Sequence, residues 1–162
     1  MQKELKNIII KEEVSILKNN KLLIILITLF LIFVFSLYAL KINNQAILRN
    51  LENYNNEFEA YLDKKIYGTE LATLINRVTN LNENNGIKKD EKNYFIENDE
   101  NSIKIEIKML LTKKTYPMEE FYNKNTAEFV KYFNLVEFNC TNIEYHNKTG
   151  KIKKMYFEQI EN

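Results

Sequence analysis

Residues 22–40, LLIILITLFLIFVFSLYAL, decide the architecture that we expect for this chain. The stretch contains no charged residue, no glycine and no proline, and only three of its side chains carry a polar group. Nineteen residues at a helical rise of about 1.5 Å span roughly 28 Å, close to the thickness of a bilayer's hydrocarbon core. Lys21 and Lys41 flank the stretch, where their long side chains reach the two interfaces. The stretch therefore predicts one transmembrane helix.

Two other interpretations of this stretch fit the sequence less well. A buried core helix needs enough protein to surround it, and a chain of 162 residues is too short for that. A cleaved signal peptide has a shorter apolar region of about 7–15 residues and a small-residue cleavage site, which is not found here. The residues before the stretch also include Glu4, Glu12 and Glu13. We therefore expect a retained signal anchor.

The flanking positive charges predict how the helix is oriented. Five lysines lie within residues 1–21, whereas only Lys41 and Arg49 follow the apolar stretch closely. Because cytoplasmic flanks carry the excess of positive charge, residues 1–21 are predicted to be cytoplasmic and residues 41–162 to lie outside the cytoplasm. Within residues 1–21, apolar and charged residues alternate at helical spacing. This spacing indicates either an interfacial amphipathic helix or an extension of the transmembrane helix.

Helical periodicity continues after the membrane segment. Residues 42–66 lack glycine and proline and repeat apolar residues at spacings of three and four, which predicts an amphipathic stalk helix. Gly68 marks a break, and Thr69 is a candidate N-cap for a second helix over about 70–81.

Alternation with a period of two dominates the rest of the chain. Residues 103–111 carry an apolar residue at every second position, alternating with Lys104, Glu106 and Lys108, and we interpret residues 94–111 as a hairpin. A short helix is expected over 119–133. A second hairpin is expected over 135–160, with a bulge near Thr141 and a turn in which Gly150 supplies a positive φ. The predicted fold class is α+β, with an antiparallel sheet of about four strands.

Residues that commonly carry chemistry are few. Cys140 lies in an apolar strand and is expected to be a buried, inert thiol, and His146 is expected to be an exposed residue at a strand end. Glu97, Asp99 and Glu100 form an acidic patch without the spacing of a calcium loop. Glycine occurs only at positions 68, 86 and 150, which excludes a phosphate-binding glycine loop. We predict no catalytic, cofactor-binding or metal-binding residues, and no enzyme activity.

A basic cluster near the second turn needs separate consideration. It consists of Lys148, Lys151, Lys153 and Lys154, and aromatic residues are interleaved with it. Such interleaving also occurs in nucleic-acid sites, but the net charge of the chain is only +1. We expect a charged turn and no nucleic-acid partner, and contact with anionic lipid or cell wall stays an alternative.

The order of elements resembles that of type IV pilins and pseudopilins. The likeness rests on residues 22–40, the stalk 42–66 and the two hairpins, and residues 67–76, YGTELATLIN, look like a segment of pilus-associated membrane proteins of clostridia. The resemblance implies an anchored stalk that carries a small antiparallel sheet. The processing site typical of pilins is absent, because residues 18–21 are KNNK and the apolar stretch contains no glutamate.

Two functions follow from these observations. The first is a non-enzymatic, single-pass membrane protein of the cell surface, pilin-like or accessory to an envelope or secretion assembly, with the bilayer and protein subunits as partners. The second is an anchored sensor or ligand-binding module. In the second case Tyr94, Tyr116, Tyr122, Tyr132 and Tyr145 line a pocket, and otherwise they fill the core.

Overall fold

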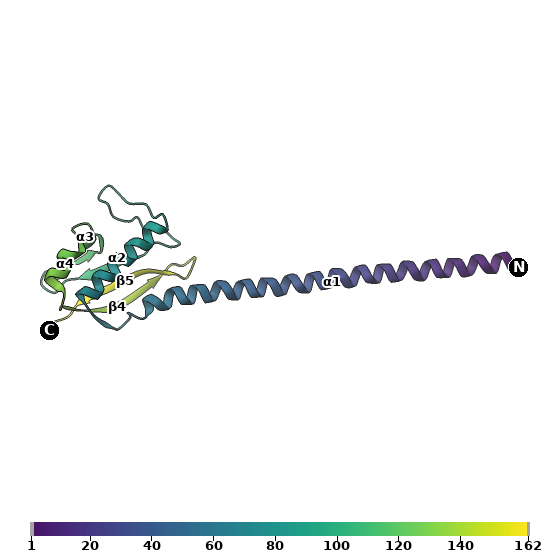
Figure 1. Ribbon diagram of the computed structural model, residues 1–162, viewed down its shortest axis with the longest axis horizontal. Helices are drawn as coiled ribbons and strands as arrows, with labels where there is room; N and C mark the ends of the chain where they lie inside the picture. Colours follow the sequence, from purple (N-terminus) through teal and green to yellow (C-terminus); the bar gives the residue numbers. More distant parts are fainter. Residues whose placement is uncertain (1, 162) are drawn as a thin grey trace. The chain divides into compact units, whose positions relative to one another are not determined.

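The computed structural model describes the backbone of residues 2–161 and the side chains of residues 20–161. The chain divides into two compact units, Met1–Arg49 and Asn50–Asn162. Helix α1 (Gln2–Glu59) forms the first unit and contributes its last turns to the second (Figure 1). The side chains of residues 1–19 lie outside the described part of the chain. The predicted amphipathic pattern and four of the five flanking lysines fall within these residues.

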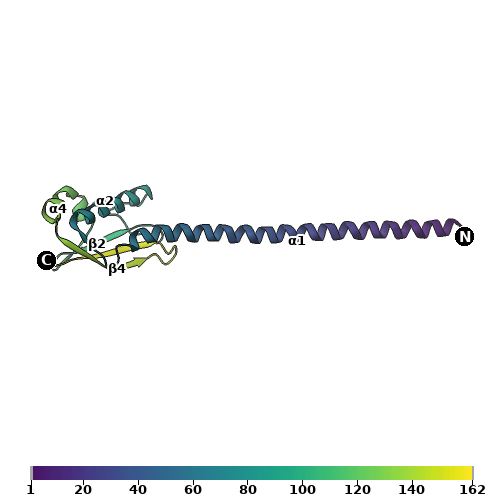
Figure 2. The ribbon, with the colours of Figure 1, turned by 60° about the horizontal axis from the view of Figure 1, so that its bottom comes forward.

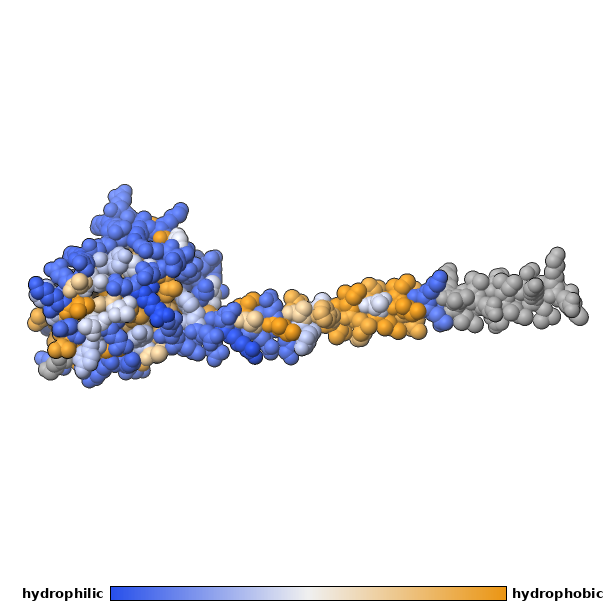
Figure 3. Space-filling model, viewed as in Figure 1, coloured by the Kyte–Doolittle hydropathy of each residue, from blue (hydrophilic) through white to orange (hydrophobic). Residues whose placement is uncertain are grey.

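The described part of α1 contains the predicted membrane segment. From Asn20 onward, α1 is the one helix in the described chain that is long and apolar enough to cross a membrane. Figure 3 shows its side chains as a continuous apolar band, in which Phe35 is 73% exposed. The hydroxyls of Thr28 and Ser36 donate to the carbonyls of Ile24 and Phe33, each at 2.7 Å, so neither needs a partner outside the helix. No described residue covers this band, which argues against the core-helix interpretation.

The second unit is an α+β domain built on a five-stranded sheet in the order β1-β4-β5-β2-β3. Its elements along the chain are β1 (Lys65–Tyr67), α2 (Gly68–Asn84), β2 (Lys104–Lys108), β3 (Thr115–Pro117), α3 (Glu119–Tyr122), α4 (Thr126–Phe133), β4 (Glu137–Tyr145) and β5 (Ile152–Gln159). All neighbouring strands are antiparallel except β2 and β5, which are parallel. Helices α2 and α4 lie on one face of the sheet (Figures 1 and 2). The predicted fold class is confirmed.

The core lies between this face and the helices. Ile105 and Ile107 of β2 and Phe157 of β5 are at most 1% exposed. The residues next to each of them along its strand are partly exposed. Helix α2 contributes a buried stripe at helical spacing, Leu71, Leu74, Ile75 and Val78. The opposite face of the sheet is polar, as the alternation in β2 and β5 requires.

The C-terminal hairpin is confirmed in detail. Strands β4 and β5 are antiparallel neighbours, and the pairing shifts between Cys140 and Asn142, where a bulge near Thr141 is predicted. Gly150 has a φ of 68° in the connecting turn. These features are readable from the sequence because they depend on local turn chemistry and on a change of phase within one strand.

The predicted hairpin over 94–111 is wrong. Only β2 is a strand in this range, and it pairs with β5 in parallel and with β3, so the sheet has five strands rather than four. Tyr94–Glu97 lies in a connecting segment with a single bridge between Lys89 and Phe95. Alternation reports that one side of a strand is buried, but it carries no information about the neighbouring strand.

Three helix boundaries also differ from the predictions. The stalk helix ends at Glu59 rather than at residue 66, because Asp63 takes a φ of 57° and the next residues pair with β4 as β1. Helix α2 begins at Gly68 without a side-chain cap, so Thr69 is not its N-cap. The helix over 119–133 is split before α4, where Asn125 has a φ of 83° and its side chain accepts from the backbone N–H of Ala127.

Two buried asparagines join helices to the backbone of distant segments. In α1, Asn55 donates to the carbonyl of Gly150 at 2.8 Å and accepts from the N–H of Ile152 at 3.1 Å. In α2, Asn82 donates to the carbonyl of Ile103 at 2.7 Å and accepts from the N–H of Ile103 at 2.8 Å. Each carboxamide thus donates to one main-chain carbonyl and accepts from one main-chain N–H, as a neighbouring strand would. These buried main-chain groups therefore have hydrogen-bond partners.

Candidate functional site

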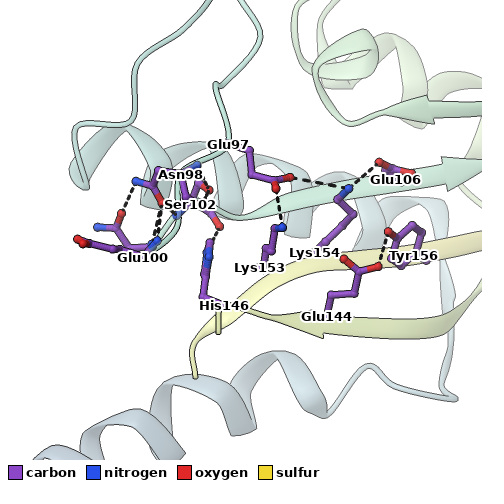
Figure 4. A network of polar contacts seen from close by, with 11 residues as sticks. Glu97, Asn98, Glu100, Ser102, Glu106, Glu144, His146, Lys153, Lys154 and Tyr156 are labelled. Carbon is purple, nitrogen blue, oxygen red and sulfur yellow. Dashed lines mark hydrogen bonds and ion pairs between the residues drawn. The ribbon is translucent and has the colours of Figure 1, made fainter. Parts of the chain in front are cut away.

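The acidic patch and the basic cluster, which the sequence presents as separate features, meet in the structure. Glu97 binds Lys153 at 2.5 Å and lies 3.9 Å from Lys154, which also pairs with Glu106 at 3.2 Å (Figure 4). The pKa of Glu97 is lowered, chiefly by its hydrogen bond to Lys153. These lysines are therefore neutralised by carboxylates of the same domain.

The other two lysines of the cluster are also engaged. Lys148 lies 3.4 Å from Asp99, and the ammonium group of Lys151 lies 5.4 Å from the ring centre of Tyr54. A surface whose cations already face carboxylates or aromatic rings has little charge left for a polyanion. This arrangement favours the charged turn over contact with nucleic acid or anionic lipid.

The prediction that His146 is exposed is wrong. Its side chain is 2% exposed, and Nε2 lies 2.7 Å from the carbonyl oxygen of Ser102 (Figure 4). A carbonyl only accepts, so Nε2 carries the proton in this contact. The Oδ1 atom of Asn98 shapes the same loop by accepting the backbone N–H groups of the three residues that end at Ser102. The hydrogen bond of His146 thus helps to hold this loop in its conformation.

Cys140 is fully buried in β4, as predicted for an inert thiol. Burial raises its pKa to about 11. At pH 8 this value lowers the thiolate fraction about 100-fold relative to an unperturbed thiol. We expect negligible reaction with iodoacetamide at pH 8 in the folded protein and rapid reaction in urea, measured by mass spectrometry. Rapid labelling of the folded chain would contradict this prediction.

Glu119 at the start of α3 is the most buried carboxylate in the described domain, with 1% exposure. One oxygen accepts from the N–H of Phe95 at 3.2 Å and lies 3.9 Å from the ammonium group of Lys104. Its other oxygen has no hydrogen-bond partner among the described residues. The hydrogen bond from Phe95 to Glu119 therefore connects the segment between α2 and β2 to α3.

The described residues contain no group of three metal-ligating side chains.

An apolar cleft lies between the turn that joins β2 to β3 and helices α3 and α4. Its volume is about 340 Å³, and its apolar walls include Met109, Leu111, Phe121, Phe129 and Phe133. The charged residues on its lining are Glu120, Lys124 and Glu128. Lys124 binds Glu120 at 2.9 Å, an interaction that raises the pKa of Lys124. The concave shape and apolar lining are typical of binding sites.

The five tyrosines proposed for a pocket have different positions. Tyr116 and Tyr132 line the cleft, whereas Tyr122 packs against the core. Tyr94 hydrogen-bonds to Glu120 behind the cleft, which raises the pKa of Tyr94 to about 12 and lowers that of Glu120. Tyr145 donates to Glu59 at 2.8 Å near the end of α1. The structure therefore brings two of the five together.

Most of the residues that form the cleft could not be identified from the sequence. The pattern places Leu111 at the end of an alternating stretch, and Phe129 and Phe133 within the expected helix over 119–133. The one available signal is the pair Leu110–Leu111, which interrupts the alternation that begins at Ile103 and is followed by Thr112 and two lysines. No protein-family model, no curated protein and no solved structure matches this chain.

Proposed function

We propose that this chain is a non-enzymatic, single-pass membrane protein that presents its α+β domain outside the cytoplasm. The observation that carries the proposal is the uncharged helix of residues 22–40, whose apolar side chains no described residue covers. Burying such a surface in hydrocarbon is strongly favourable, and the hydroxyls within it are already bonded to the helix. The excess of lysine before the helix supports an external domain.

Within this class, the architecture supports a pilin-like or accessory subunit of an envelope or secretion assembly. An apolar helix followed by a small domain with a mostly antiparallel sheet is close to the arrangement that the resemblance to pilins implies. The processing glycine and the glutamate of the pilin helix are missing. We therefore propose assembly without removal of the leading segment.

The experiment that tests the proposal combines membrane extraction with protease accessibility. The full chain carries one epitope tag at each end and is followed in membranes of the producing bacterium. We expect retention in the membrane after alkaline washing, and loss of only the C-terminal tag when intact cells are treated with protease. Release by alkali would contradict the anchor, and protection of residues 41–162 would contradict the orientation.

The apolar cleft favours a second function, an anchored module that binds an apolar ligand or peptide. Tyr116 and Tyr132 line the cleft together with Phe121, Phe129 and Phe133. A fluorescent apolar probe such as ANS, titrated onto the purified full chain, distinguishes this function. Saturable fluorescence that is lost in Tyr132→Asp, a change at a 64% exposed residue of the cleft, but kept in Leu62→Asp would support it.

A further inference from the structure

One residue beside the cleft is exposed to an unusual degree. Leu111 is 92% exposed at the tip of the turn between β2 and β3. Two backbone hydrogen bonds of 3.0 Å fix this turn, from Met109 to the carbonyl of Lys114 and from Lys113 to the carbonyl of Met109. A leucine held in water by a fixed turn favours burial against another molecule.

The cleft that could receive such a side chain lies directly beside it. Leu111 itself forms part of the lining, together with the aromatic residues of α3 and α4. Tyr132, which lines the cleft, and Leu135, which follows the end of α4, are 64% and 72% exposed. In Figure 3, apolar atoms are visible at the end of the domain that carries α4. A projection and a hollow of the same chemistry on one surface are what a two-fold interface requires.

The charges around the projection and the hollow are complementary. Lys113 and Lys114 follow Leu111 in the same turn, after Thr112, and neither makes an ion pair with another described residue. Glu128 also lines the cleft and makes no ion pair within 4.0 Å among the described residues, because its neighbour Lys124 binds Glu120 instead. When one copy's turn enters the other's cleft, two lysines without an ion pair meet a carboxylate without one. This complementarity points to a second copy of the chain rather than to an unrelated apolar ligand.

We propose that two copies of this chain associate about a two-fold axis, with Leu111 of each copy inserted into the cleft of the other. Lys113 and Lys114 then lie beside Glu128 of the partner subunit. The patch is small, so the association is weak and depends on concentration. It involves only the α+β domain and does not require α1 to cross a membrane.

The test is the oligomeric state of the purified full chain in detergent micelles, measured by analytical ultracentrifugation over a series of protein concentrations. The wild type should pass from monomer to dimer. Leu111→Asp should weaken the dimer at least tenfold. Leu62→Asp, a matched change at a 42% exposed leucine next to the opposite edge of the sheet, should leave it unchanged. Circular dichroism verifies that each variant is folded.

A charge exchange separates a direct contact from an effect on folding. Lys113→Glu with Lys114→Glu should weaken the dimer, and Glu128→Lys should do the same. All three changes together should restore the dimer, because the contacts are re-formed with reversed signs. A monomeric wild type at every concentration would overturn the proposal. So would a dimer that survives Leu111→Asp, or a triple variant that dimerises no better than the separate charge variants.

Discussion

Asn82→Asp should lower the free energy of unfolding by about 3–5 kcal/mol at neutral pH, although it exchanges a single NH₂ group for oxygen. The side chain is fully buried and both donates to and accepts from the main chain of Ile103. An ionised carboxylate cannot donate, so the carbonyl of Ile103 loses its partner and faces a buried negative charge. Urea denaturation monitored by circular dichroism measures the loss.

The same variant makes a prediction about pH. Burial raises the pKa of the carboxyl group introduced by Asn82→Asp above its value in the unfolded chain. The penalty is therefore largest above the folded-state pKa and falls as the pH drops from that value toward the unfolded-state pKa, because a protonated acid can again donate to Ile103. Asn82→Ala, which lacks an ionisable group, is the matched control and should show no such recovery. Equal losses for both variants at all pH values would contradict this interpretation.

Gly68→Ala should destabilise the domain by about 2–4 kcal/mol, which is a large effect for one methyl group. A Cβ atom at Gly68 would lie 2.0 Å from the carbonyl oxygen of Phe133, at the end of α4. The obstacle is backbone rather than a flexible side chain, and the N–H of Gly68 is bonded to the carbonyl of Val136 at 2.9 Å. The start of α2 and the end of α4 must therefore separate.

Gly86→Ala is the matched control for this prediction. Gly86 has a φ of 66°, and a Cβ atom added there would meet no other atom within 4 Å. The only cost is therefore about 1–2 kcal/mol of left-handed backbone strain. Gly86→Asn should recover part of that cost, because asparagine tolerates this conformation. Thermal unfolding of the three variants under identical conditions ranks them. The prediction is contradicted if Gly68→Ala lowers the stability of the domain no more than Gly86→Ala does. The close approach of Gly68 to the backbone of Phe133 would then not contribute to the cost of the substitution.

The two glycines show how far sequence patterns reach. Gly68 is interpreted from the sequence as a break between elements, and both glycines do lie at element ends. At Gly86 the reason is local, since a positive φ favours glycine in any surroundings. At Gly68 the reason is the backbone of a residue 65 positions later in the chain, which no local pattern reports.

The residues of the candidate site show the same difference between local and long-range causes. Cys140 is expected to be buried because its neighbours in the strand are apolar, and it is. His146 is expected to be exposed because it borders a turn, yet the carbonyl of Ser102 covers it from a segment 44 residues away. The acidic patch at Glu97 and the basic cluster at Lys153 are each recognisable in the sequence, but their pairing across the domain is not.

The sequence by itself determined the apolar helix of α1, the α+β class and the hairpin of β4 and β5. Each of these depends on composition, periodicity or turn chemistry within a short window of the chain. The tertiary structure alone decided that β2 lies parallel to β5, that asparagines at 55 and 82 act as strand partners, and that Leu111 projects beside a cleft. Strand order and side-chain contacts arise from segments far apart in the chain, and their free energy depends on a geometry that exists only after the chain has folded.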